Sequence, residues 1–235
     1  YAIPRELSER FNIRRYGFHG LAHRFMVEQF VRMHPALAHA RVITLQLGSG
    51  CSATASIAGR PVDTSMGFTP LEGLIMGTRS GSIDPSLPLY LAAHGSTPTE
   101  VASILNTQSG LLALSGRTSD VRELVAAASQ GDERADAALD AFCYSIKKCI
   151  GAYAAALGGV DGIVFGGGVG ENSAEIRQRV CTDMEWCGIH IDAESNRLAV
   201  DDVRRLDGPP GNVEVWAVRV RESAIVAQEG FSCLA

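Results

Sequence analysis

Three glycine-rich turns each follow an expected strand and could admit an anionic ligand to the backbone. They lie at residues 48–50, 77–81 and 166–170. Glycine places no Cβ in the path of the ligand, and the N–H groups at the start of a following helix face a phosphate with the positive end of the helix dipole. A single such turn is equally well explained by packing, and packing is favoured for residues 48–50 taken alone. Two such turns in one domain suggest that two stretches of backbone close on a phosphate-bearing ligand from opposite sides.

Four charged or titratable side chains near these turns could act on such a ligand, and each also has a simpler explanation. Arg79 lies among small residues in a loop and could bind a multi-oxygen anion, or be a surface arginine. His19 precedes a glycine at an expected helix start, where it could donate to an anion or cap the helix, whereas His23 indicates packing. Asp120 caps an expected helix or contacts a nucleoside. Glu222, just after an expected strand, could meet a magnesium ion or be an ordinary glutamate of a first helical turn.

The composition is that of a soluble globular protein, with 235 residues, 46% hydrophobic, 20% charged and a net charge of −5. This balance argues against nucleic acid as a partner but not against a small anion. The cysteines form neither a CxxC pair nor a zinc spacing and indicate reduced thiols of a cytoplasmic protein. The N-terminus has no signal-peptide core, and glycines and Asp161 interrupt the apolar residues 150–170, so we expect no membrane span. The chain opens without methionine, in an expected linker.

Helices and strands alternate along the chain. Strands are expected at residues 41–47, 51–57, from 62, at 162–165, 189–191 and 213–220, and helices at 21–33, 88–94, 99–106, 121–129, 133–157, 174–184 and 222–229. Residues 65–88 form a long loop with apolar anchors, which is typical of a functional loop. Residues 110–115 are expected to be an apolar link, and the residues from 192 to 211 a polar connection. The pattern predicts a mixed α/β sheet flanked by helices.

Four segments occur in this order: RRYGFHGLAHR, LQLGSGCSATASIAGRPVDTSMGFTPLEGLIMGTRSGSIDP, SDVRE and FGGGVGENSAEIR. With them, essentially the whole chain resembles the acetate kinase family (acetate and butyrate kinases). The resemblance implies the ribonuclease H-like fold of actin, Hsp70 and hexokinase. It also implies that residues 1–18 are an interdomain lead-in and 19–235 a C-terminal nucleotide-binding and dimerisation domain. The implied reaction converts ATP and acetate to ADP and acetyl phosphate with Mg²⁺.

The resemblance also assigns roles to single residues. The transition-state histidine falls on His19 and an active-site arginine on Arg79. A cation and an imidazole suit in-line phosphoryl transfer, in which catalysis is mainly positioning and charge neutralisation. The magnesium carboxylate falls on Glu222. The nucleotide contacts fall on Gln46, Gly48, Ser49, Gly50, Asp120, Val121, Arg122, Gly168, Val169, Gly170, Glu171 and Asn172.

The chain departs from the family pattern in three respects. Gln46 and Ser49 replace the histidine and asparagine of the family's HLGNG, so we expect weakened or retuned nucleotide contact. Leu21 and Ala22 replace a Thr-Ser pair. The family protein is also longer, and its first half would supply another phosphate turn, an arginine and a carboxylate.

Three interpretations remain open. The chain is the C-terminal portion of an acetate kinase that is inactive alone, a non-catalytic nucleotide-binding or dimerisation remnant, or part of a propionate or butyrate kinase. The resemblance also implies a homodimer formed through this domain. The long helix and the Gly/Ala-rich residues 152–156 could serve that contact, although core packing explains them equally simply.

Overall fold

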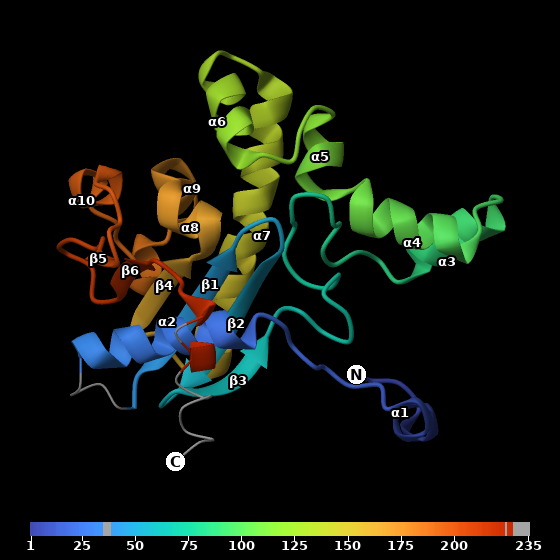
Figure 1. The fold of residues 1–235 in the computed structure, drawn as a ribbon, viewed down its shortest axis with the longest axis horizontal. Coiled ribbons are helices and arrows are strands. Elements are labelled where there is room, and N and C mark those ends of the chain that lie inside the picture. The colour runs from blue at the N-terminus through green and yellow to red at the C-terminus, as the bar shows by residue number, and fades with distance from the viewer. Residues whose placement is uncertain (35–38, 224, 228–235) are drawn as a thin grey trace.

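A six-stranded mixed sheet forms the centre of the molecule in a computed structural model that describes residues 1–34, 39–223 and 225–227 (Figure 1). The strand order is β3-β2-β1-β4-β6-β5. The strands are β1 (Arg41–Leu47), β2 (Cys51–Ile57), β3 (Arg60–Thr64), β4 (Gly162–Gly166), β5 (Val203–Arg205) and β6 (Glu214–Val218). The first three form an antiparallel meander, and β5 pairs antiparallel with β6. The expected mixed sheet with flanking helices is confirmed.

The parallel strands β1, β4 and β6 end at one edge of the sheet. Gln46 pairs with Gly166, and Phe165 pairs with Ala217, so the three carboxyl ends are level. Ligands of open α/β sheets bind at this edge, outside the carboxyl ends of the strands. The segments that follow these strands are therefore the segments that can build a site.

Helices cover both faces of the sheet. The helices are α1 (Arg5–Phe11), α2 (Gly20–Met33), α3 (Ser86–Ala93), α4 (Pro98–Thr107), α5 (Gly110–Ser115), α6 (Val121–Ser129), α7 (Glu133–Leu157), α8 (Gly167–Asn172), α9 (Ala174–Cys181) and α10 (Ala193–Arg197). Successive side chains of a strand point to opposite faces. In β1, Ile43 packs in the core under α7, whereas Val42 packs with Phe30 of α2.

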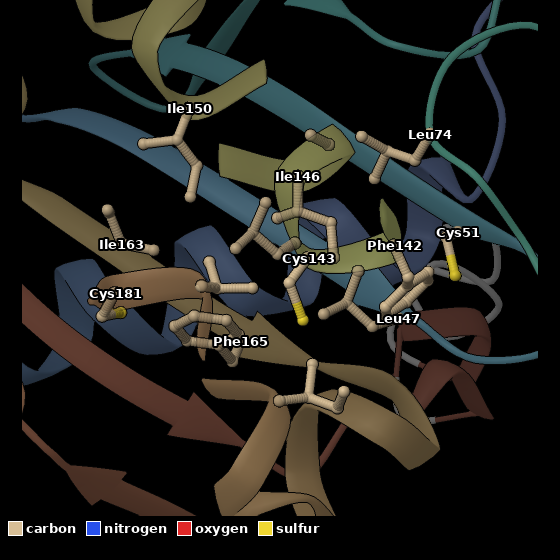
Figure 2. Close-up of a cluster of buried hydrophobic side chains, with 14 of the residues drawn as sticks. Leu47, Cys51, Leu74, Phe142, Cys143, Ile146, Ile150, Ile163, Phe165 and Cys181 are labelled. Atoms are coloured by element: carbon tan, nitrogen blue, oxygen red, sulfur yellow. The ribbon is translucent and has the colours of Figure 1, made fainter. Parts of the chain in front are cut away.

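The main core lies between α7 and the sheet. Phe142, Ile146 and Ile150 of α7 meet Ile163 and Phe165 of β4 there, all at most 1% exposed (Figure 2). The helix begins where the Asp132 carboxylate accepts hydrogen bonds from the N–H groups of Arg134 and Ala135, at 3.1 and 3.0 Å. It ends at Gly158, whose left-handed backbone suits glycine. The limits expected for this helix from the sequence are confirmed.

Several sequence-based expectations were wrong in detail. Residues 167–172 form the short helix α8 instead of an open glycine turn, and residues 110–115 form α5 instead of a link. The expected polar connection contains strand β5, and the expected strand at 189–191 consists of two isolated bridges. Helix α9 ends at Cys181, not at residue 184. For α5 and α8, hydrogen bonds with segments outside the helix decide the outcome over local propensity.

Two elements stand away from the sheet. Helix α1, in the expected lead-in, has only exposed side chains apart from half-buried Ser8. Helices α3 and α4 form an arm that projects from the body (Figure 1). The arm carries apolar side chains at its surface, with Leu89 71% and Tyr90 60% exposed. The division into a lead-in over residues 1–18 and a domain from residue 19 remains a prediction.

The remaining expectations concern cysteines, the last helix and membrane spans. Cys51, Cys143, Cys149, Cys181 and Cys187 are free thiols, and Cys233 lies outside the described residues. Residues 222, 223 and 225–227 are helical, while 224, 228 and 229 of the expected last helix are also outside the described part. Within the described part of the chain, no helix is both long and apolar enough to cross a membrane.

Candidate active site

The turn between β1 and β2 is held by the long loop of residues 65–88. The N–H of Gly48 donates to the carbonyl of Gly50 at 3.2 Å, which closes the turn. The N–H of Gly77 donates to the carbonyl of Ser49 at 3.2 Å. Carbonyl oxygens of the turn are thus paired within the fold. The turn and the loop that carries Arg79 form one unit at the carboxyl end of β1.

Helix α5 anchors the loop that carries Arg79. The N–H groups of Leu111 and Leu112 at its start donate to the carbonyls of Met76 and Gly77, at 2.9 and 3.0 Å. The N–H of Ser109 donates to the carbonyl of Thr78 at 2.9 Å. The first N–H groups of a helix lack partners within it, so the loop satisfies them. This is why the apolar residues 110–115 form a helix.

Helix α8 begins directly against the end of β1. Gly167 has a φ of +76°, and a Cβ at this position would lie 2.5 Å from the carbonyl oxygen of Leu47. Only glycine fits such a left-handed, crowded position. A Cβ at the next residue, Gly168, would meet nothing within 4 Å. One glycine therefore permits the close approach, and the next leaves open space beside it.

Two polar contacts hold the far end of α8. The Arg177 guanidinium is 2% exposed and donates to the carbonyls of Gly170 and Glu171, at 2.8 and 2.9 Å. The Glu171 carboxylate accepts a hydrogen bond of 2.9 Å from the N–H of Val220, beyond β6. The terminal carbonyls of a helix need such donors. Arg177 was missed by the sequence analysis, although an arginine three residues into a helix that follows a glycine run is a usable signal.

One cavity of about 820 Å³ connects these elements. It is lined by the β1–β2 turn, the start of α6 and helix α8. The expected nucleotide residues along it are Gly48, Ser49, Asp120, Val121, Arg122, Gly168, Val169 and Asn172. Two of the glycine segments thus line one cavity, and the binding of a phosphate-bearing ligand between them stays a prediction. Gln46, Gly50, Gly170 and Glu171 are not among the lining residues, so a direct contact from these four to a ligand in the cavity stays a prediction.

Asp120 and Arg122 form a fixed pair at the cavity wall. The Asp120 carboxylate accepts from the Arg122 N–H at 2.8 Å and caps α6, and it also pairs with the Arg122 guanidinium at 2.6 Å. The hydrogen bond from the Arg122 guanidinium lowers the pKa of Asp120 to about 2. The simpler explanation of Asp120 as a helix cap is confirmed. The cap also leaves the planar Arg122 side chain, exposed at 89%, beside the cavity.

His19 and Arg79 meet at Gly50. A Cβ on Gly50 would lie 3.3 Å from Arg79 Nη1 and 3.5 Å from His19 Nε2. His19 is half-buried and has a left-handed backbone, with a φ of 58°. Burial lowers the pKa of His19, the Glu222 carboxylate acts in the opposite direction, and the Arg79 charge lowers it further. The structure therefore gathers the two expected catalytic side chains, with Glu222 close enough to influence the ring.

A buried polar chain leads away from His19. His19 Nδ1 lies 2.9 Å from Ser52 Oγ, Ser52 Oγ lies 2.7 Å from His23 Nε2, and His23 Nδ1 lies 2.7 Å from Thr44 Oγ1. His23 was expected to have a packing role, and its side chain is indeed buried, at 5% exposed. Its hydrogen-bonding contacts were not expected. Burial lowers the pKa of His23 to about 3. The signal in the sequence was the alternation of Ser52, Thr54 and Ser56 with apolar residues in a buried strand.

Gln46 occupies the space between β1 and α8. Its Oε1 atom is buried and has no hydrogen-bond partner in the part of the chain that the structure describes. A Cβ on Gly167 would lie 2.7 Å from Gln46 Nε2. The Gln46 side chain thus packs against the start of α8.

Glu222 fits a magnesium site in which phosphate and water supply the other ligands. Across residues 1–34, 39–223 and 225–227, no group of three or more His, Cys, Asp or Glu residues could hold a metal ion by itself. Magnesium, however, is commonly held by one or two carboxylates together with substrate phosphates and water. An exposed carboxylate near His19 and Arg79 fits that mode.

Comparisons with known proteins agree over the whole chain. Residues 1–228 match the family described as the Acetokinase family. An acetate kinase of Chloroherpeton thalassium is 44% identical over 238 residues, covering 100% of this chain and 57% of that protein. The crystal structure of Porphyromonas gingivalis acetate kinase superposes with a TM-score of 0.95 at 40% identity, covering 100% of this chain and 59% of that one.

A propionate kinase from Francisella tularensis superposes nearly as well. Its TM-score is 0.91 at 39% identity, covering 97% of this chain and 58% of that one. The expected fold class is confirmed by these structures. The chain spans somewhat more than half the length of the relatives that it matches.

Proposed function

Because this chain belongs to the acetokinase family, we propose that it forms the nucleotide-binding part of a phosphotransferase. The proposed reaction transfers the γ-phosphoryl group of ATP to acetate, giving ADP and acetyl phosphate. The single observation that best supports this is the cavity of about 820 Å³ between the β1–β2 turn, the start of α6 and α8. Its size suits a nucleotide. Arg79 and His19 lie beside Gly50, the residue that follows the lining residue Ser49.

The chain's own residues act mainly by positioning. The adenosine would lie against Arg122 and Gly168, where the wall is open, and the phosphates would extend toward Ser49 and Gly50. Arg79 would hold oxygens of the transferred group and neutralise their charge, and the His19 ring would face the same group. Phosphoryl transfer needs little else than in-line placement and charge stabilisation.

Magnesium is proposed to bind between Glu222 and the nucleotide phosphates. When bound, the ion would neutralise phosphate charge. Glu222 would supply one oxygen ligand to the ion, and the remaining ligands would come from phosphate oxygens and water.

The remaining groups of the site are proposed to come from the part of the relatives that this chain does not match. The family pattern places another phosphate turn, an arginine and a carboxylate there. We therefore expect the 235 residues alone to bind Mg·ATP weakly and to turn over negligibly. A hydroxamate assay, which traps acyl phosphate, tests this, and turnover at the rate of a whole acetate kinase would overturn it.

Calorimetric titration of Mg·ATP tests nucleotide binding directly. The Asn172 side chain donates to the carbonyl of Gly168 at 2.8 Å on the cavity wall. Asn106 in α4 makes the same contact to Ala102, at 2.9 Å, away from the cavity. Asn172 is proposed to make one hydrogen bond to the nucleotide, and loss of that bond predicts about threefold to tenfold weaker binding for Asn172→Ala. Asn106→Ala should bind like the unchanged chain, and an absence of binding heat in the unchanged chain would refute the proposal.

A longer carboxylic acid is the second candidate substrate. The similarity to a propionate kinase structure supports it. Competition between acetate and propionate, measured in a protein that contains the complementary segment, distinguishes the two acids.

We also propose a cytoplasmic homodimer. The five described cysteines are free thiols, which suits a reducing compartment. The apolar surface of α3 supports self-association, since Leu89 and Tyr90 are more than half exposed. Sedimentation of the chain and of Leu89→Glu tests this, with a shift of the variant to the monomer as the expected result.

A further inference from the structure

The buried polar chain behind His19 ends at a backbone carbonyl of β2. It runs from His19 through Ser52 and His23 to Thr44, whose hydroxyl also donates to the carbonyl of Thr54 at 3.4 Å. Ser52 and Thr44 are fully buried, and His23 is 5% exposed. Among the described residues, no charged side chain hydrogen-bonds to Ser52, His23 or Thr44. The protons of these groups are therefore ordered by their contacts with one another.

One proton order satisfies all four contacts, and an alternative order satisfies only the three contacts among the side chains. Each hydroxyl has one proton to donate, and each neutral imidazole has one N–H donor and one acceptor nitrogen. In the first order, Thr44 donates to the Thr54 carbonyl, His23 Nδ1–H donates to Thr44, Ser52 donates to His23 Nε2, and His19 Nδ1–H donates to Ser52. In the alternative, second order, Thr44 donates to His23 Nδ1, His23 Nε2–H donates to Ser52, and Ser52 donates to His19 Nδ1, so the proton of His19 lies on Nε2.

Two features of the structure favour the first order. It uses the Thr54 carbonyl as an additional acceptor, whereas the second order leaves the contact from Thr44 to that carbonyl unused. It also places a lone pair, instead of an N–H group, on His19 Nε2, which faces Gly50 beside the Arg79 guanidinium. A positive charge attracts a lone pair and repels an N–H dipole.

We propose that Ser52 and His23 are positioning residues that hold the neutral His19 ring as its Nδ1–H tautomer, with Nε2 facing Gly50 and Arg79. The contact at one ring nitrogen decides which tautomer is present and how the ring is oriented. The Nδ1–H form is the less populated tautomer of an isolated histidine, so the buried chain opposes the intrinsic preference. The part that this orientation has in phosphoryl transfer rests on the proposed function.

The advantage of this order is a ring whose orientation is the same in both charge states. His19 donates from Nδ1 to Ser52 whether or not Nε2 carries a proton. In the second order, a proton added to His19 would set an N–H group against the Ser52 hydroxyl proton and force the buried chain to rearrange. The first order therefore preorganises the ring beside Arg79.

Nitrogen-15 spectra of the histidine rings test the proposal on the unchanged 235-residue chain. At pH 8 both rings are neutral, because burial lowers the pKa of each. Long-range proton–nitrogen spectra distinguish a pyrrole-type from a pyridine-type nitrogen, and His19→Gln and His23→Gln assign the signals. We expect pyrrole-type Nδ1 and pyridine-type Nε2 in both histidines. Pyrrole-type Nε2 in His19 would overturn the proposal, and this measurement needs no variant beyond those used for assignment.

Ser52→Ala and its matched control test the cause. Ser56 lies on the same strand and face, is 2% exposed, and donates to the carbonyl of Val42 at 3.1 Å, apart from the chain behind His19. Ser52→Ala should exchange the two nitrogen types of His19, and Ser56→Ala should leave them unchanged. An unchanged His19 spectrum in Ser52→Ala would refute the role of Ser52, and a change in both variants would indicate a general packing effect and refute it as well.

A parallel titration with Mg·ATP separates this proposal from the proposed function. If ATP fails to bind while both tautomer results hold, the function is wrong and the positioning chain stands. If ATP binds while His19 carries its proton on Nε2, the positioning proposal fails alone.

Discussion

Replacing Gly167 by alanine should destabilise the chain, whereas the same change at Gly168 should not. Gly167 has a φ of +76°, and a Cβ there would lie 2.5 Å from the Leu47 carbonyl oxygen and 2.7 Å from Gln46 Nε2. Gly168 has open space within 4 Å of a Cβ. The two positions are adjacent in sequence and in the same helix, so each variant is the control for the other.

The expected magnitudes follow from the backbone and the contacts. A left-handed backbone costs a non-glycine residue about 1–2 kcal/mol. Forcing an additional methyl group into a packed site costs about 1–3 kcal/mol. Gly167→Ala should therefore lose at least about 2 kcal/mol, which lowers the Tm of a chain of this size by at least about 4 °C. Gly168→Ala should leave the Tm unchanged or raise it, because alanine is favoured over glycine in a helix by up to about 1 kcal/mol.

Thermal unfolding followed by circular dichroism measures both effects, and Mg·ATP titration adds a second contrast. The methyl group of Gly168→Ala would enter the cavity and should weaken nucleotide binding without loss of stability. Equal unfolding temperatures for Gly167→Ala and the unchanged chain would refute the argument that α8 depends on a glycine at this place. Unchanged ATP affinity in Gly168→Ala would instead refute the proposed position of the nucleotide.

Three further predictions concern buried polar groups. Burial lowers the pKa of His23 to about 3, against about 6.5 in the unfolded chain. The free energy of unfolding should therefore be constant above pH 6.5 and fall as the pH decreases toward 3, by about 2 kcal/mol at pH 5. Urea unfolding of His23→Gln should show a correspondingly smaller change between pH 7 and pH 5. Arg177→Met should lower the free energy of unfolding, measured in urea, by about 3 kcal/mol or more, because carbonyls of α8 lose their donors. The control Arg197→Met, at an exposed position of α10, should lower it little. Gln46→Met should be neutral or stabilising by up to about 2 kcal/mol in the same assay, since it removes a buried oxygen without a partner.

Elements with local signals could be predicted from the sequence. The limits of α7 agree because Asp132 caps its start and Gly158 ends it, and both signals lie within the segment. Strands β1 and β2 also have the expected limits, because their side chains are buried and β-branched or small and the glycines between them permit a turn. These features depend on neighbours in the chain.

Elements held by distant partners could not be predicted. Helix α8 exists because its carbonyls meet Arg177, and α5 because the loop before it accepts its first hydrogen bonds. The cavity lining was largely foreseen from the family resemblance. The contacts of Ser52 could not be foreseen, because they depend on which face of β2 meets α2. The alternation of side chains along a strand does not specify which element packs on each face.

The hydrogen bond between Glu171 and the backbone of Val220 ties the nucleotide wall to the segment that carries Glu222. Glu171 and Val220 are 49 positions apart along the chain, so this hydrogen bond connects two segments that are distant in the sequence. A displacement of α8 would therefore be passed to the backbone at Val220, two residues before Glu222. A single hydrogen bond thus links the position of the cavity wall to the position of this carboxylate.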